Sequence, residues 1–172
     1  MPVKKPTVIP AIRPATHKDA TGMSAVLGPI LSMLQSQRRS DPDHIIQHYI
    51  EHPDKILCCV AEGNNAEILG FQSLIIATDG NPYGVRTGWG IIGTYVNLNA
   101  GRRGIGSALF AATLQAARNG KITDIDATIG TENRLGLGYY AALGFETYRN
   151  LPNAICKCYK VGSSSPTPRP GS

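Results

Sequence analysis

Long apolar runs and aromatic residues are both scarce in this sequence, and each shortage excludes a class of protein. No stretch approaches the roughly 18 uninterrupted apolar residues of a membrane-spanning helix, and the lysine-containing start has no apolar signal segment. We therefore expect a cytoplasmic protein with no membrane partner. Aromatic residues make up only 6% and are not interleaved with basic ones, so nucleic-acid binding is disfavoured despite a net charge of +5.

The sequence holds only four cysteines, and their spacing does not suit a metal ion. They occur as Cys58-Cys59 and as Cys156-x-Cys158, and neither pair has the two-residue interval with which two thiolates reach one zinc ion. We expect reduced thiols and no metal site. Cys58 and Cys59 fall within a predicted strand, so their side chains should face opposite sides of a sheet.

The length of 172 residues suits one domain, and 42% hydrophobic residues is the composition of a folded chain. The first residues are rich in Pro and Lys, and the last ones are rich in Pro and Ser, so neither end offers much to anchor a backbone. We predict a flexible segment at 1–10, one ordered domain at 11–161 and a disordered tail at 162–172.

The order of the predicted elements indicates an α/β fold around one mixed sheet. Runs of β-branched residues predict strands, and apolar positions repeating at three and four residues predict helices. Gly28-Pro29 is expected to interrupt the first helical region, whereas Asp41 and Pro42 should cap and begin the next helix. The expected strands cover 11–13, 56–61, 68–77, 89–98, 122–129, 145–149 and 154–159, and the expected helices cover 19–38, 42–52, 104–118 and 132–143.

The run from Tyr95 to Leu109 passes from a strand through a glycine turn directly into the strongest helix pattern. The first amides of a helix lack internal partners and carry partial positive charge, so this turn suits a phosphate or diphosphate. Gly104 and Gly106 would let the backbone approach the anion, and Arg102 and Arg103 would add charged donors. Glycines that merely turn the chain are the alternative interpretation.

Other glycine motifs do not fit these residues. A dinucleotide-binding fingerprint requires a third glycine where Leu109 stands, and a P-loop requires Gly-Lys followed by Ser or Thr, which is absent. A nucleophile elbow centred on Ser107 fails because Ile105 occupies its first glycine position. The turn therefore belongs to neither of these nucleotide-binding motifs nor to the hydrolase motif.

Three stretches together resemble the acetyl-CoA motif and the following helix of the GNAT superfamily of N-acetyltransferases: the strand at 89–98, the run Arg-Arg-Gly-Ile-Gly-Ser-Ala-Leu at 102–109, and Asn133 followed by Tyr-Ala-Ala-Leu-Gly-Phe at 140–145. The likeness covers roughly residues 56–150. It implies that 11–161 is a single acetyltransferase domain with a strongly twisted mixed sheet of about six or seven strands. The fourth and fifth strands would splay apart to admit the pantetheine arm of acetyl-CoA.

The resemblance also implies which residues form the site. The backbones of Tyr95 and Val96 would pair with the pantetheine amides, and Asn133 would contact the cofactor arm from the next helix. Tyr140 would protonate the departing thiolate, whereas its neighbour Tyr139 is expected to be a core or surface aromatic residue. The amides that would hold the diphosphate belong to Arg102, Arg103, Gly104, Ile105, Gly106 and Ser107.

Two features depart from the family pattern. Gly101 stands where relatives commonly place Gln or Arg, and the fourth strand has no glutamate to serve as a general base. The base is therefore unassigned. Water held by strand carbonyls is one alternative, and the others are the side chains of Glu132, Asp126, His44 and His48.

The expected activity is transfer of an acetyl group from acetyl-CoA to a primary amine, by direct attack in a ternary complex. The acceptor should lie between segment 19–52 and loop 150–153. A small amino acid or amino-acid-like toxin is the expected class, with an antibiotic, a polyamine or a protein N-terminus as rivals. Many relatives dimerise, so a homodimer is one expected assembly. A non-catalytic acetyl-CoA-binding regulatory module is the alternative, because the strand carboxylate is missing.

Overall fold

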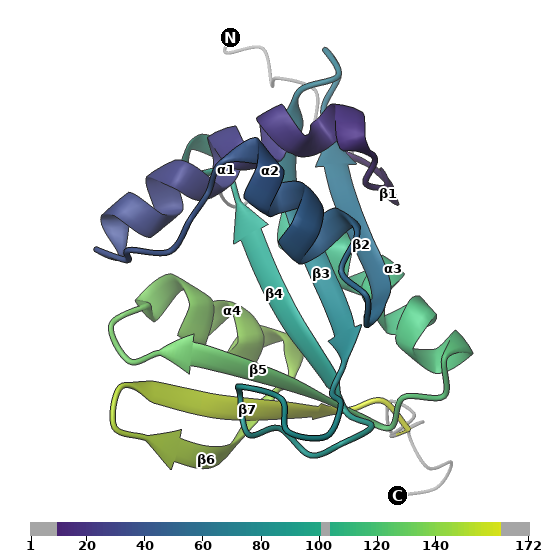
Figure 1. Ribbon diagram of the computed structural model, residues 1–172, viewed down its shortest axis with the longest axis vertical. Coiled ribbons are helices and arrows are strands. Elements are labelled where there is room, and N and C mark those ends of the chain that lie inside the picture. The colour runs from purple at the N-terminus through teal and green to yellow at the C-terminus, as the bar shows by residue number, and fades with distance from the viewer. Residues whose placement is uncertain (1–9, 101–103, 163–172) are drawn as a thin grey trace, which may run out of the picture.

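The computed structural model describes residues 10–100 and 104–162, which form one sheet flanked by helices (Figure 1). Its strands are β1 (Ala11–Pro14), β2 (Lys55–Glu62), β3 (Ile68–Ile76), β4 (Gly90–Val96), β5 (Asp124–Gly130), β6 (Glu146–Leu151) and β7 (Ala154–Lys160). Its helices are α1 (Ala20–Met33), α2 (Pro42–Ile45), α3 (Ile105–Asn119) and α4 (Arg134–Leu143), with the 3-10 turns η1 (His17–Asp19) and η3 (Leu98–Ala100) and the π-helical turn η2 (Ile46–Ile50). The expectations for 1–9 and 163–172, and for Arg102 and Arg103, lie outside the described residues.

The sheet has the order β1-β2-β3-β4-β5-β7-β6, and β4–β5 is its one parallel pair within the described chain. These two strands pair only through Gly90 with Ile125 and Ile91 with Asp126. Beyond that point they diverge, as Figure 1 shows. The expected mixed sheet with splayed fourth and fifth strands is confirmed.

Helices cover both faces of the sheet because its strands bury apolar side chains on both. Phe71 of β3 is fully buried beneath α1, α2 and η2, together with Cys58 of β2. Cys59 points to the opposite face, where it packs with Ile105 and Leu109 of α3. The prediction that the two neighbouring cysteines face opposite sides is therefore confirmed.

The predicted interruption of the first helix at Gly28-Pro29 is wrong, because α1 continues through both residues to Met33. Proline inside a helix costs about 3 kcal/mol or more. Burying one large apolar side chain contributes about 1.5–3 kcal/mol, and α1 buries several of them on the face toward the sheet. These side chains are Met23, Val26, Leu27, Ile30 and Leu31. Packing on both sides of the proline therefore outweighs its local cost.

The chain after α1 forms a loop over residues 34–41, where the sequence predicted helix as far as Arg38. The predicted start of the next helix is confirmed, since the Asp41 carboxylate accepts a hydrogen bond from the His44 N–H at 3.3 Å and Pro42 takes the first position. Among the described residues, no helix combines the length and apolar character that crossing a membrane requires.

Candidate active site

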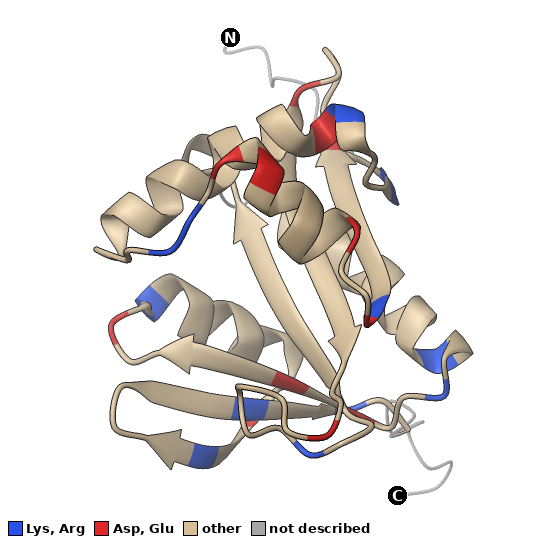
Figure 2. Ribbon diagram, viewed as in Figure 1, with Lys and Arg blue, Asp and Glu red and all other residues tan. Residues whose placement is uncertain are grey.

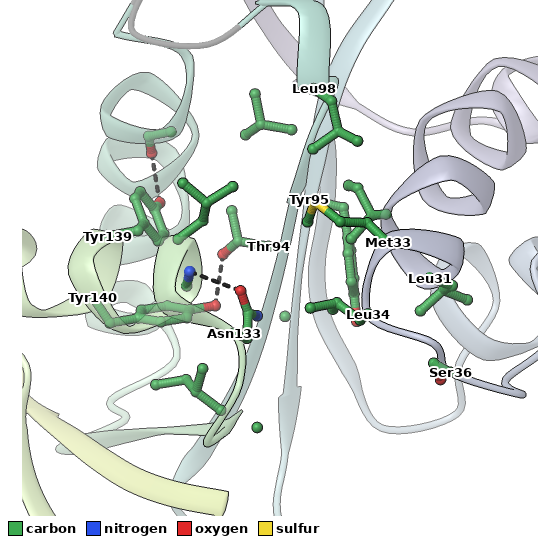
Figure 3. A pocket seen from close by; sticks show the side chains of 18 of the residues that line it. Leu31, Met33, Leu34, Ser36, Thr94, Tyr95, Leu98, Asn133, Tyr139 and Tyr140 are labelled. Carbon is green, nitrogen blue, oxygen red and sulfur yellow. Dashed lines mark hydrogen bonds between the residues drawn. The ribbon is translucent and has the colours of Figure 1, made fainter.

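A cavity of about 950 Å³ occupies the opening between β4 and β5 (Figure 3). One wall is the end of α1 with the loop that follows, and the opposite wall is the end of β5 with the start of α4. The carboxyl half of β4 lies between these walls, and the first turn of α3 closes one end. Segments far apart in the sequence thus meet in one cleft at the point where the sheet opens.

Beyond its two pairs with β5, the edge of β4 that faces that strand carries backbone groups with no strand partner among residues 10–100 and 104–162. β3 and β4 pair without a bulge, and the Asn97 N–H donates a hydrogen bond to the Leu69 C=O. In an antiparallel pair, every second residue of a strand bonds to its neighbour, so Tyr95, two residues before Asn97, bonds to β3. The N–H and C=O groups of Thr94 and Val96 therefore point toward β5. These groups are free to pair with an extended ligand.

The backbone of Tyr95 does not face the opening as expected, because it is paired with Phe71 of β3. Its side chain, however, lies at the cleft. The ring packs 5.0 Å from that of Phe71 and 5.9 Å from that of Tyr49, on the sheet face covered by α1 and α2. Tyr95 therefore contributes a side chain on that face.

The first turn of α3 lines the cleft, as expected for an anion-binding helix start. Gly104 caps the helix with φ of +73°, a left-handed conformation that glycine adopts without strain, and no atom of the described residues contacts the position of its Cβ within 4 Å. Ser107 is exposed and also lines the cleft, while Ile105 is buried and anchors the turn. An anion can therefore reach the backbone here.

Gly106 has a further structural reason to be glycine. A Cβ at this position would lie 2.5 Å from Cε2 of Tyr139, whose hydroxyl donates to the Gly106 carbonyl at 2.7 Å. Tyr139 was expected to be a core or surface aromatic residue. In the structure it lines the cleft, and its hydrogen bond to Gly106 links α4 to the start of α3. Burial raises the pKa of its hydroxyl to about 12. No spacing in the sequence predicts this contact.

Asn133 and Tyr140, at the two ends of one helical face of α4, both line the cleft (Figure 3). The Asn133 Oδ1 accepts a hydrogen bond from the Gly136 N–H at 3.0 Å and so caps the helix. Tyr140 is 6% exposed, and its hydroxyl lies 2.8 Å from Oγ1 of Thr94. Burial, opposed by this hydrogen bond, raises the pKa of Tyr140 well above its ordinary value, so the hydroxyl carries its proton at neutral pH.

Gln72 donates a hydrogen bond to Thr94, the residue that contacts the Tyr140 hydroxyl. Its Nε2 donates to Oγ1 of Thr94 at 2.9 Å and to the Tyr139 hydroxyl at 3.0 Å. The Thr94 hydroxyl accepts this bond and can in turn donate a hydrogen bond to the Tyr140 oxygen, so that the Tyr140 hydroxyl proton can point into the cleft. Gln72 and Thr94 are functional candidates that sequence reasoning missed.

The four side chains considered as general bases lie in different places. Asp126 is fully buried, accepts hydrogen bonds from Thr128 at 2.8 Å and Tyr148 at 2.6 Å, and has a pKa raised by burial. The rings of His44 and His48 stack at 4.8 Å, and burial lowers the pKa of His48 to about 4. Of the four candidates, only Glu132 is among the residues that line the cleft.

The two segments expected to frame the acceptor both contribute to the cleft. From the first come Ile30, Leu31, Met33, Leu34, Ser36 and Arg38. From the loop between β6 and β7 come Pro152 and Asn153. The wall formed by α1 and the loop after it is mainly apolar, and Arg38 of that loop is its cationic side chain.

A sheet opened between two strands, with free backbone groups on one edge and a helix start beside it, has the geometry expected of an acyltransferase with an acyl-CoA site between the strands. Residues 29–145 match the sequence model of the acetyltransferase (GNAT) family. This match covers well over half of the chain, so the chain belongs to the GNAT family.

Solved structures of acetyltransferases share the fold. The chain is 18% identical to yncA of Salmonella typhimurium, a structure named as an acetyltransferase with its cofactor acetyl-CoA, with a TM-score of 0.72 and coverage of 91% of this chain and 96% of that one. A structure named as a phosphinothricin N-acetyltransferase is 18% identical, with a TM-score of 0.68 and coverage of 87% and 96%. The ribosomal-protein-alanine N-acetyltransferase of Brucella melitensis is 19% identical, with a TM-score of 0.68 and coverage of 87% and 99%.

No curated protein matches the chain. Family membership nevertheless confirms the expected class of enzyme, an acetyltransferase with acetyl-CoA as co-substrate. The described residues fit that co-substrate, since the free edge of β4 can accommodate an extended amide arm and the start of α3 presents unpaired amides beside it.

Proposed function

We propose that the chain transfers the acetyl group of acetyl-CoA to a primary amine of a small molecule, by direct attack in a ternary complex. The unpaired edge of β4 carries this proposal, because it opens into the cleft next to the Tyr140 hydroxyl and the start of α3. A purely structural opening would not need these three features to converge.

The backbone of Thr94 and Val96 would bind the pantetheine amides in place of the missing pairing with β5. The amides from Gly104 to Ser107, together with Arg102 and Arg103, would hold the diphosphate at the start of α3. Asn133 would contact the arm from the opposite wall, since it lines the cleft while its Oδ1 caps α4. The thioester would then lie near the middle of β4.

The reaction forms a C–N bond and breaks the C–S bond of the thioester. The amine attacks in its neutral form, so its ammonium proton must first leave, and the second N–H proton is lost after attack. Tyr140 would give its hydroxyl proton to the departing sulfur, while Thr94, whose oxygen accepts from Gln72, would donate a hydrogen bond to the tyrosine oxygen. A thiol has an ordinary pKa near 8.5 and a tyrosine one near 10, so this transfer is uphill, and the second amine proton would return through water to the Tyr140 oxygen.

Removal of the amine protons would run through water or through Glu132. Glu132 is exposed at the cleft wall, which would allow proton exchange with solvent. Asp126 is less suited, because both carboxylate oxygens already accept hydrogen bonds within the protein. The two histidines are less suited because they lie outside the cleft lining.

The proposed acceptor is an amino acid or an amino-acid-like toxin. One structure with this fold is named as a phosphinothricin N-acetyltransferase, while another is named for a ribosomal-protein alanine, so a protein N-terminus is the main rival. A cytoplasmic location and a homodimer belong to the same proposal. The four cysteines are free, which supports a reducing compartment.

Thiol release from acetyl-CoA across a panel of amines tests the activity directly. Amino acids, polyamines, aminoglycosides and N-terminal peptides should each be supplied at saturating acetyl-CoA. Release that depends on one class of amine supports the transferase. Tight acetyl-CoA binding without release on any amine would instead favour the non-catalytic regulatory module.

A further inference from the structure

Arg38 is a cation on the wall of the cleft whose charge is not neutralised by a carboxylate of the described chain. It lies in the loop between α1 and α2, where Figure 2 shows a basic segment. Its Nη2 donates to the Tyr49 hydroxyl at 2.8 Å and to the Tyr95 hydroxyl at 3.3 Å. The adjacent Arg39, by contrast, forms an ion pair with Asp41 at 2.8 Å.

The two tyrosines position the guanidinium without cancelling its charge. Tyr49 is 3% exposed, and burial raises its pKa above the ordinary value, so its hydroxyl is neutral at physiological pH. Both hydroxyls accept from the same nitrogen, so within the described chain no hydrogen bond engages Nη1 or Nε of Arg38. Either group can donate a charge-assisted hydrogen bond to a carboxylate oxygen of a ligand.

The position of Arg38 separates it from the proposed diphosphate site. The Tyr95 ring lies with Phe71 and Tyr49 on the sheet face covered by α1 and α2. The start of α3, which would hold the diphosphate, packs on the other face of the sheet, where Ile105 is buried. An anion bound by Arg38 therefore belongs to the acceptor rather than to the phosphates of coenzyme A.

The same wall offers an apolar surface beside the arginine. Leu31 and Leu34 line the cleft next to Met33, which is 48% exposed (Figure 3). An exposed methionine adapts to side chains of different shape. An acceptor with an anionic group and a neighbouring apolar side chain would satisfy both the guanidinium and this surface.

We propose that Arg38 binds the carboxylate of the acceptor, which makes the acceptor a free amino acid with an apolar side chain. This inference rests on the proposed acetyltransferase function and adds to it the group that selects the substrate. A polyamine lacks this anion, and the reacting end of a protein N-terminus has an amide in its place. The arginine, held by Tyr49 and Tyr95, would thus discriminate against both rivals.

The test compares binding of standard L-amino acids and their carboxamides to the protein saturated with coenzyme A, measured by calorimetry. The carboxamides keep the amine and the side chain but lose the negative charge. We expect apolar amino acids to bind about ten- to a hundredfold more tightly than their amides, the range given by a hydrogen bond between charged groups. Equal affinity for acid and amide, or no binding of any acid, would overturn the proposal.

Variants assign the preference to Arg38. Arg38→Gln should abolish the preference for acids and leave the affinity for amides unchanged, whereas Arg38→Lys should retain part of it. Arg39→Gln is the matched control, since Arg39 is a neighbouring exposed arginine outside the cleft lining, and should behave as the wild type. An acid preference that survives Arg38→Gln would contradict the assignment.

Thiol release separates this proposal from the proposed function. Release with the amides or polyamines, as fast as with the acids, would retain the transferase and overturn the role of Arg38. Acid-selective binding that depends on Arg38, without release on any amine, would retain the anion site and overturn the transferase.

Discussion

The Tyr140 hydroxyl lies 2.8 Å from Oγ1 of Thr94, at the point where β4 has separated from β5. One residue comes from a helix and the other from the strand that would bind the acyl donor. Their contact places a protonated hydroxyl beside the expected position of the thioester. In the proposed mechanism, this side chain of β4 would join the catalytic acid to the strand that binds the acyl donor.

Replacing Tyr140 by phenylalanine should lower kcat by about 10²–10⁴-fold, because it removes the acid that protonates the thiolate. The measurement is turnover at saturating acetyl-CoA. Tyr159→Phe is a suitable control, since Tyr159 packs against the same Phe145 as a partly buried ring. An unchanged turnover number in Tyr140→Phe would remove this residue from the mechanism.

Replacing Thr94 by valine should lower kcat by about three- to tenfold, the value of one ordinary hydrogen bond. The Tyr140 hydroxyl would lose the donor that orients its proton, while the backbone of β4 would be unchanged. The affinity for acetyl-CoA should therefore stay the same, and Thr94→Ser should restore turnover. A loss of affinity equal to the loss of turnover would indicate a structural role instead.

Replacing Gly106 by alanine should destabilise the protein by about 1–3 kcal/mol, because the new Cβ would collide with the Tyr139 ring. Gly138→Ala is the control, as its Cβ position has no neighbour within 4 Å in the part of the chain that the structure describes, and it should increase stability by about 0.5–1 kcal/mol. Urea unfolding measures both changes. Equal effects at the two sites would show that Tyr139 can move away from α3.

The buried Asp126 should make stability depend on pH in a defined direction. Burial raises its pKa, so between the ordinary carboxyl value and the raised one the folded state binds more protons than the unfolded state. Stability from this group is present at low pH and is lost as pH rises through that window. Urea unfolding of wild type and Asp126→Asn across the window should show this loss in the wild type alone. Parallel pH curves would contradict it.

Local patterns predicted the fold and much of the cleft, because they are carried by short segments. The Asp41-Pro42 helix start and the glycine turn into α3 are both of this kind. The path of α1 through Pro29 was missed, since burial against a distant sheet decides it. Contacts between remote segments were missed for the same reason, among them Gln72 with Tyr139 and Arg38 with Tyr95.

The sequence also did not predict which backbone groups of β4 face β3 and which face β5. The family resemblance pointed to the Tyr95 backbone as a donor-binding group, but pairing with Phe71 directs that backbone toward β3. A sequence does not show which edge of a strand each amide faces until the register with its neighbours is known. In the structure, the backbones of Thr94 and Val96 face away from β3, so the proposed contact falls on these two residues rather than on Tyr95.

The central claim is that acetyl-CoA is held by main-chain groups at the start of α3 and along the free edge of β4. Calorimetry of acetyl-CoA with the wild type and with Gly104→Val tests it most directly, because valine is strained at φ of +73° and adds bulk where an anion would approach. We predict binding to the wild type and at least tenfold weaker binding to a folded Gly104→Val variant. No heat of binding to the wild type, or equal affinity in the two proteins, would contradict the account.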